Sequence, residues 1–539
     1  MKLKTFFLAA TVALFVIAPV LDRAYSFEIQ NENGIKTGVP AAVPVLTKNY
    51  TNGHFKFFYT DNDPVPDNNV TLEEIQATAN AMNAFWNKYA DNFTEPKHYI
   101  SDGKKMINVR VYYLGDGLYG QTSSDRSIIY LNSKLTVKDA CKRKTISARE
   151  LFRRVQYSYG YTDADGTAGN MRWIVDGTAV WSQKYTNPGI RDYMPDMNSG
   201  LEAPDRDLIT ERDYDAAHFW VYLQKRAGWD AVRDVWAEYA TNGHDAWAAV
   251  DTVVTRQLGL LFDEYAGEWA AANYLKDKAD SGNFDYSDNE ISETSCGVVY
   301  GPLSHVPKVA NIPVTNDTIW GRNESVKPYG ADYFIFKLDP ALTRIQIKLE
   351  GDDAGKLRYY ILGIKNNALV SSTLVTTADH TADLPLTAGE WDTIALIVAG
   401  GSTGGAYTVT INNPCIAGKW LYKTFDNEFY LNQAASSDPA VSRVTGWVSS
   451  PECGTWNVAG TFEGSRISWT MKDSPNETCC NWMITGKVND ACDFISGTWD
   501  NLNCRGRGDI SLSKTANISG APSDMSGTPS AGPLPGLPQ

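Results

Sequence analysis

Histidine is scarce in this chain of 539 residues. Only six are present, and no two stand four residues apart, the spacing at which one helix face grips a metal ion. No CxxC pair occurs, which disfavours a zinc site built from thiolates. Positive charge is also in deficit, and the net charge of −14 disfavours nucleic acid and anionic membranes as partners. The histidines are His54, His98, His218, His244, His305 and His380.

Long apolar runs are confined to the start of the sequence. Lys2 and Lys4 precede an apolar stretch that is too short to span a bilayer comfortably, and small residues follow up to Ser26. This pattern predicts a signal peptide over residues 1–26, and therefore a secreted or periplasmic protein. An uncleaved anchor is the alternative. No transmembrane segment is expected after the signal peptide.

Cysteines are few but clustered. Of the eight, six fall between Cys415 and Cys504. An even number gathered in one small region of an exported chain predicts disulfides, and Cys415 and Cys504 would staple the ends of that region.

The order of hydrophobic patterns predicts a multidomain protein. Residues 27–275 have strands first and helices later, an α+β layout, and Thr71 with Glu74 forms a capping box at the start of one helix. Residues 276–294 are charged and read as a linker. Short strands predict a β-sandwich over 295–413, and residues 515–539, rich in Pro, Gly and Ser, read as a disordered tail. We expect strands at 54–60, 106–114, 127–131, 333–338, 344–349, 358–364, 393–398 and 407–411, and helices at 71–89, 145–159, 214–226, 229–239 and 261–275.

Residues 415–514 are rich in tryptophan, and we expect them to form a disulfide-containing unit. Short strands that end in glycine repeat there, as in GTWNVAGTFEG and ITGKVNDACDFISGTW. Neighbouring strands of this kind would pair by hairpins into a small antiparallel β-barrel. The unit is loosely similar to lipocalin-like or avidin-like domains.

Two segments carry a resemblance to a known family. Residues 148–157 read ARELFRRVQY, and residues 173–181 read WIVDGTAVW. Together they resemble secreted zinc metallopeptidases of the gluzincin type, which carry HExxH on one helix and a glutamate ligand on the next. The resemblance places Arg149 and Arg153 at the two histidine positions, Glu150 at the general-base position and Asp176 at the third-ligand position.

Arginine cannot replace histidine as a metal ligand. Its guanidinium stays protonated and offers no lone pair. We therefore expect no zinc and no catalytic residue, and propose that the two arginines and the two carboxylates form a neutral network in place of the metal. Two simpler interpretations stay open: Ser147 and Glu150 match a capping box, and Arg149, Arg153 and Arg154 would suit a solvated helix face.

Three other features have ordinary explanations. His218 stands beside Phe219 and Trp220, so we expect a packed core histidine. Asp163-Ala164-Asp165-Gly166 lacks the later ligands of a calcium loop and predicts a turn. Arg507-Gly508-Asp509 is an RGD triplet, and a motif of only three residues often occurs by chance.

These patterns predict a non-catalytic binding or surface protein, a pseudo-metallopeptidase. Its ligand would be a protein, peptide or glycan, with Arg149, Arg153 and Asp176 as candidate contacts and the tryptophan-rich unit as a second recognition surface. The alternative is an active secreted hydrolase. It would be a peptidase with unidentified ligands, or a metal-free glycosidase that uses Glu150 and Asp176, although neighbouring arginines favour ionised carboxylates and remove the acid.

Overall fold

The computed structural model describes residues 43–516 with internal gaps. The predicted signal peptide, residues 517–539 of the predicted tail and every cysteine except Cys141 lie outside the described residues. The gaps are 125–126, 164, 166–169, 285, 287–292, 296, 316–317, 341, 343, 352–356, 376–379, 387–389, 413–417, 423–426, 436–441, 451–453, 464–465, 473–480, 489–493 and 503–505.

The N-terminal part opens with a mixed six-stranded sheet in the order β1-β2-β4-β6-β5, with β3 paired to β4. Strands β2, β4 and β6 run parallel, and β5 is an antiparallel edge strand against β6. The strands are β1 (Lys48–Asn52), β2 (Phe55–Tyr59), β3 (Tyr99–Ser101), β4 (Lys104–Tyr112), β5 (Gly120–Thr122) and β6 (Ile128–Asn132).

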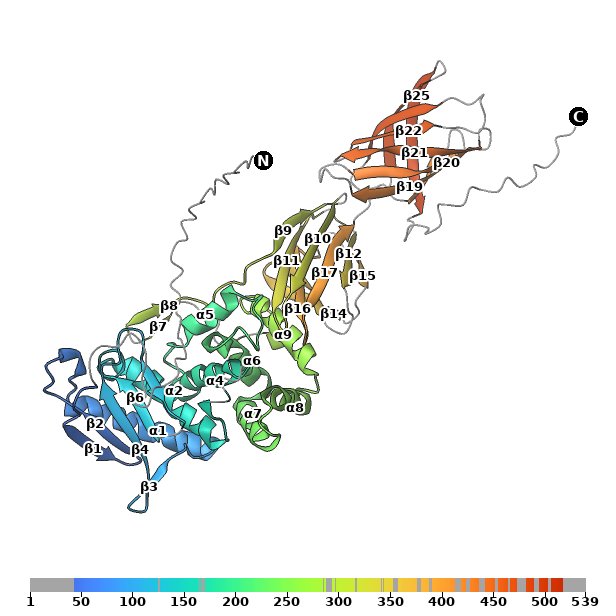
Figure 1. Ribbon diagram of the computed structural model, residues 1–539. Coiled ribbons are helices and arrows are strands. Elements are labelled where there is room, and N and C mark those ends of the chain that lie inside the picture. Colours follow the sequence, from blue (N-terminus) through green and yellow to red (C-terminus); the bar gives the residue numbers. More distant parts are fainter. Residues whose placement is uncertain are drawn as a thin grey trace, which may run out of the picture.

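Helices cover this sheet and extend beyond it (Figure 1). The first begins at the predicted capping box, because Thr71 accepts a hydrogen bond from the backbone of Glu74, which in turn accepts one from the backbone of Thr71. The helices are α1 (Leu72–Asn92), α2 (Ala140–Ser158), α4 (Arg172–Thr186), α5 (Met194–Glu202), α6 (Ala217–Ala227), α7 (Trp229–Thr241), α8 (Ala246–Leu258) and α9 (Phe262–Leu275).

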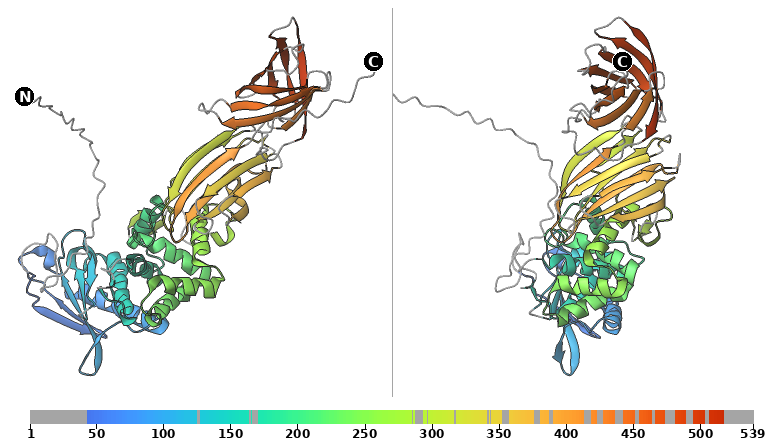
Figure 2. Two further views of the ribbon diagram at one scale, coloured as in Figure 1. Left: turned by 45° about the vertical axis from the view of Figure 1, so that its right-hand side comes forward. Right: turned by 90° about the vertical axis from the view of Figure 1, so that its right-hand side faces the viewer.

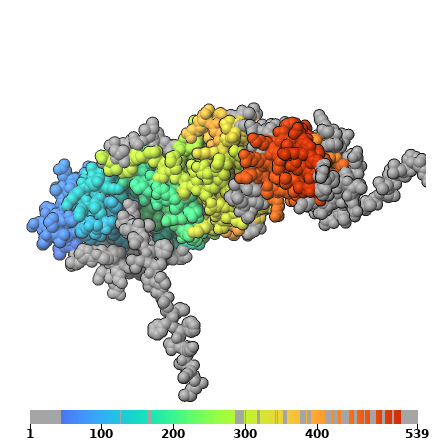
Figure 3. Space-filling view, turned by 90° about the horizontal axis from the view of Figure 1, so that it is seen from above, coloured from blue at the N-terminus to red at the C-terminus, as the bar shows by residue number. Residues whose placement is uncertain are grey.

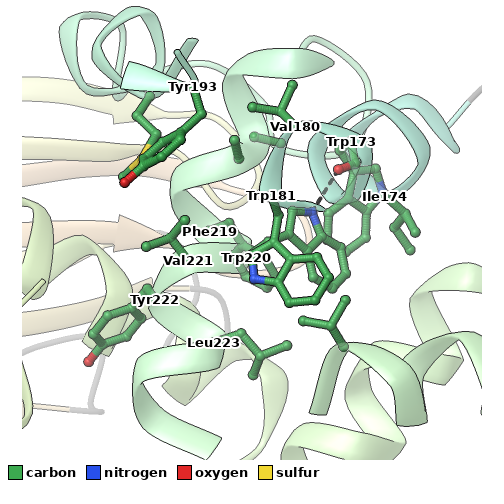
Figure 4. Close-up of a cluster of buried hydrophobic side chains, with 14 of the residues drawn as sticks. Trp173, Ile174, Val180, Trp181, Tyr193, Phe219, Trp220, Val221, Tyr222 and Leu223 are labelled. Carbon is green, nitrogen blue, oxygen red and sulfur yellow. Dashed lines mark hydrogen bonds between the residues drawn. The ribbon is translucent and has the colours of Figure 1, made fainter. Parts of the chain in front are cut away.

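Aromatic side chains fill the space between α4 and α6 (Figure 4). The indoles of Trp173 and Trp220 stack with centroids 5.5 Å apart, and Trp220 Nε1 donates a 2.8 Å hydrogen bond to the carbonyl of Trp173. Both rings are fully buried. This contact fixes α4 against α6 and so fixes the position of Asp176, which lies on α4.

Two antiparallel-rich sheets follow and enclose a common apolar core. One has the order β14-β13-β16-β11-β9, and the other has the order β10-β17-β12-β15. All five predicted strands of this region are present. The strands are β9 (Ala310–Val314), β10 (Ile319–Val326), β11 (Ala331–Leu338), β12 (Arg344–Gly351), β13 (Leu357–Lys365), β14 (Ala368–Val375), β15 (His380–Pro385), β16 (Thr393–Gly400) and β17 (Gly405–Asn412).

This β-sandwich shares one continuous core with the helical part. The hydroxyl of Tyr333, on β11, donates a 3.0 Å hydrogen bond to the carbonyl of Ala270 on α9. Within the segment predicted to be a linker, Tyr286 is buried and donates a 2.6 Å hydrogen bond to Asn273 Oδ1. A short hairpin of β7 (Glu293–Ser295) and β8 (Val298–Tyr300) begins at the end of that segment. The two units are therefore packed together and not merely tethered.

The last unit is a closed barrel of eight antiparallel strands, beyond the sandwich (Figures 1, 2 and 3). Its interior is apolar and contains buried Trp420, Phe429, Trp456 and Trp469. The chain is therefore a multidomain protein with an α+β part, a two-sheet part and a barrel. The barrel strands are β18 (Gly418–Tyr422), β19 (Asn427–Ala435), β20 (Ser442–Ser450), β21 (Gly454–Glu463), β22 (Arg466–Lys472), β23 (Trp482–Val488), β24 (Phe494–Asn501) and β25 (Arg507–Ala516).

Two further observations concern a cysteine and the helices. Cys141, near the start of α2, is disulfide-bonded. In the part of the chain that the structure describes, no helix combines the length and the apolar character needed to cross a lipid bilayer.

Candidate functional site

Helix α2 begins earlier than the sequence suggested. Asp139 caps it by accepting hydrogen bonds from the backbone N–H groups of Cys141 and Lys142, at 2.8 and 2.9 Å. Ser147 therefore lies in the middle of the helix and is fully buried. The interpretation of Ser147 and Glu150 as a capping box is wrong, because a capping residue must lie at the helix end.

The three arginines Arg149, Arg153 and Arg154 of α2 face the protein interior. The side chains of Arg149 and Arg153 are 13% and 8% exposed, and Arg154 is completely buried. The interpretation of these residues as a solvated face is therefore also wrong. Arg154 points away from the other two and donates hydrogen bonds to the carbonyls of Lys97 and Ser123, at 2.8 and 2.6 Å.

Helix α4 brings Asp176 against α2. Gln156 on α2 donates hydrogen bonds to the carbonyl of Val175, at 2.8 Å, and to Thr178 Oγ1, at 3.0 Å. Gly177 allows α6 to pack closely from the other side, because a Cβ there would lie 2.7 Å from Trp220 Cδ1. Asp176 is thereby held facing α2, where it forms a buried ion pair with Arg153.

A second ion pair lies beside the first. Both Nε and Nη2 of Arg149 lie 3.0 Å from Glu150 Oε1, and the other carboxylate oxygen accepts a 2.8 Å hydrogen bond from Thr122 Oγ1 on β5. Gly120, also on β5, gives the Glu150 side chain room, because a Cβ there would lie 2.9 Å from Glu150 Cγ. The edge strand and α2 therefore hold Glu150 from both sides.

Tyr214 completes the cluster from η3 (Tyr214–Ala216). Its hydroxyl lies 3.5 Å from Arg153 Nη2, and its ring lies 5.4 Å from Arg149 Cζ in a cation–π contact. Burial and the nearby Asp176 carboxylate raise the pKa of the Tyr214 phenol, so it stays neutral at ordinary pH. Neither Thr122 nor Tyr214 belongs to a sequence motif, so neither was predicted as part of the site.

The cluster of Arg149, Glu150, Arg153 and Asp176 has two positive and two negative charges. Burial lowers the pKa of both arginines, but attraction to Glu150 and Asp176 outweighs this effect and raises both pKa values above the ordinary arginine range. The guanidinium groups therefore remain charged at every accessible pH. We call these four residues the charge cluster.

The zinc ion that the resemblance implies does not fit the charge cluster. A tetrahedral zinc site needs about three ligands with available lone pairs. The two residues at the histidine positions have none, and each carboxylate already accepts hydrogen bonds from a guanidinium. No metal-assisted step is therefore assigned to these residues.

His218 lies apart from the charge cluster, as a core histidine. It is fully buried, its Nδ1 lies 2.6 Å from the carbonyl oxygen of Asp215, and its ring is 4.8 Å from that of Trp269. Burial, reinforced by the nearby Arg212, lowers its pKa well below the ordinary value, so it is neutral. The prediction of a packed histidine is confirmed.

The RGD triplet lies in a regular strand. Its three residues open β25 and pair with β24, with Gly508 opposite Trp499. A Cβ on Gly508 would lie 2.7 Å from Trp499 Cζ2, so packing explains the glycine. Asp163, in the DADG segment, accepts hydrogen bonds from Ser124 and Tyr157. Ala164 and Gly166 of that segment lie outside the described residues.

Comparison with known proteins adds little. No family model matches the chain, and no curated protein matches it. The chain is similar to the pre-peptidase C-terminal domain of a collagenase from Bacillus anthracis, with 12% identity, a TM-score of 0.16, and coverage of 20% of this chain and 100% of that chain. It is also similar to a family GH115 4-O-methyl-α-glucuronidase, with 10% identity, a TM-score of 0.12, and coverage of 59% and 53%. Scores this low support no conclusion about fold or function.

Proposed function

We propose that residues 27–275 form a metallopeptidase-like domain without metal chemistry, and that the chain is an exported binding or surface protein. The observation that carries this proposal is the charge cluster. The resemblance would place Arg149 and Arg153 at the positions of the two histidine ligands, and these arginines are ion-paired with Glu150 and Asp176. A site that has replaced its ion with a set of ion pairs has lost the Lewis acid of the family reaction.

A metal-free hydrolase is the weaker proposal. A glycosidase that used Glu150 and Asp176 would need one protonated carboxylic acid for the leaving group. Both carboxylates are instead ion-paired with guanidinium groups, and each side chain is only 3% exposed, so neither is open to a glycosidic bond. The contacts therefore support binding over catalysis.

Arg149 is the member of the charge cluster best placed to contact a ligand. Its side chain is 13% exposed, compared with 8% for Arg153 and 3% for Asp176. We propose that a protein, peptide or glycan ligand contacts the charge cluster through Arg149, and that the pair of Arg153 and Asp176 keeps the residues around Arg149 in position. The cluster is neutral overall, so a strongly charged ligand gains little from it.

Export is part of the same proposal. The sequence pattern of residues 1–26 resembles a secretory signal, and Cys141 is disulfide-bonded. Disulfides persist mainly in oxidising compartments. A secreted or periplasmic location accounts for both.

The test compares three proteins in zinc titration calorimetry and in a casein assay with and without chelator. They are the wild type, the variant Arg149→His/Arg153→His/Asp176→Glu, and the matched control Arg149→Gln/Arg153→Gln/Asp176→Glu. We expect stoichiometric zinc binding by the histidine variant alone, because only imidazoles restore the ligand set. Chelator-sensitive cleavage by the wild type would end the proposal. If the histidine variant folds but does not bind zinc, the proposed family resemblance is wrong.

A further inference from the structure

The barrel has two unlike ends. At one end, Lys419, at the start of β18, pairs with Ala516, at the end of β25. The opposite end is where β18 ends at Tyr422 and β19 begins at Asn427. We call it the distal end.

Three tryptophans gather inside the distal end. Alternation along the strands places Trp456 on the same face of β21 as buried Val458, and Trp482 on the same face of β23 as buried Ile484. The rings of Trp482 and Trp499 stack with centroids 5.0 Å apart, and Trp456 lies 6.2 Å from Trp482. Trp456 is 2% exposed, whereas Trp482 and Trp499 are only partly buried. A graded aromatic lining therefore runs from the rim into the interior.

Three buried polar atoms at this end have no hydrogen-bond partner among the described residues. They are the indole N–H of Trp456 and the side-chain oxygens of Asn427 and Asn501. Trp456 and Asn427 are each 2% exposed, and Asn501 lies opposite Trp482. Burying such an atom without a partner costs about 1–3 kcal/mol. One atom is a donor and two are acceptors, so a molecule that satisfies them must have both acceptor and donor groups.

The absence of buried charges in the described part of the barrel narrows the class of ligand further. Among the described residues, no Asp, Glu, Lys or Arg is buried in the barrel, where the buried polar side chains are Asn427 and Ser450. An ionic ligand would lose its hydration there without a counter-charge. A purely apolar chain would leave the donor of Trp456 and the acceptor of Asn427 unsatisfied. A neutral polyhydroxyl ring avoids both costs.

We infer that the distal end of the barrel is a binding site for a neutral sugar ring. The C–H face of a pyranose stacks on an indole, and its hydroxyl groups both donate and accept hydrogen bonds. Trp482 and Trp499 supply the stacking surface, while Trp456 and Asn427 fix the orientation of the ring. This inference is independent of the charge cluster, because the two regions share no residue.

The test follows tryptophan emission and binding heat as the full chain is titrated with cellohexaose, chitohexaose, xylohexaose, mannohexaose and laminarihexaose. We expect at least one to bind. We expect Trp456→Phe, which keeps a ring but removes the N–H donor, to weaken that binding about tenfold or more. Asn427→Leu should have a similar effect.

Trp447→Phe is the matched control. Trp447 alternates along its strand with the buried Val448 and therefore lies on the outer wall of the barrel. Its ring stacks on that of Tyr430, with the two ring centroids 3.8 Å apart. It should leave binding unchanged, as should the charge-cluster variants. The inference is overturned if none of the five oligosaccharides binds, if the neutral apolar probe N-phenyl-1-naphthylamine binds in their place, or if Trp447→Phe weakens binding as much as Trp456→Phe.

Discussion

The substitution Asp176→Ala probes the charge cluster most sharply. It leaves Arg153, whose side chain is 8% exposed, without its counter-charge in the interior. Breaking a buried ion pair from one side costs about 3–5 kcal/mol, because the remaining charge is desolvated and unpaired. We expect the free energy of unfolding, measured by urea titration with far-UV circular dichroism, to fall by that amount.

Two controls separate this effect from the loss of any side chain. Glu95→Ala removes a partner from the exposed pair with Lys105, whose side chains are 42% and 43% exposed, and should cost at most about 1 kcal/mol. The double variant Arg153→Met/Asp176→Ala removes both buried charges. It should be more stable than Asp176→Ala alone by about 2 kcal/mol or more. The reasoning fails if Asp176→Ala costs no more than Glu95→Ala.

Three further predictions concern other parts of the chain. Burial raises the pKa of Asp332 to about 6, so this carboxyl binds its proton more tightly in the folded protein than in the unfolded chain. The free energy of unfolding therefore falls as the pH rises from about 4 to above 6. Asp332→Asn should therefore raise the free energy of unfolding by up to about 3 kcal/mol at pH 8 and leave it unchanged at pH 3. Equal effects of the substitution at the two pH values would contradict this reasoning. Thr122→Val should cost about 1–3 kcal/mol in urea unfolding, because Glu150 loses its hydroxyl donor, and no loss would show that the contact is unimportant. Gly508→Ala should lower the thermal midpoint of the barrel, because the new Cβ would meet the ring of Trp499, and an unchanged midpoint would refute that packing.

Strong local signals were enough to predict much of the fold. The capping box at Thr71 and Glu74 fixed the start of α1, and the alternating strands of the sandwich were recognisable from their turns. Helix α2 was predicted to begin at about Thr145, yet it begins at Ala140. Its first turn is the polar run Cys-Lys-Arg-Lys, which has no apolar periodicity and becomes helical through the cap at Asp139.

Helices α5 and α8 were not predicted. Helix α8 contains several β-branched residues, which have weak intrinsic helix propensity, and its apolar face is stabilised by packing against α6, α7 and α9. The charge cluster was predictable in part. Helical spacing placed Arg149 and Arg153 on one face, and the distance along the chain to Asp176 suggested the pair. Thr122 and Tyr214 come from an edge strand and a 3-10 turn, and only tertiary structure brings them together.

The central claim is that paired guanidinium groups stand where a metal ion would be bound. The most direct measurement is diffraction above and below the zinc absorption edge from crystals of the wild-type chain grown with zinc chloride. We predict no anomalous peak among Arg149, Arg153 and Asp176, and electron density for the Arg153–Asp176 pair. A zinc peak bonded to protein side chains at that place would contradict the account.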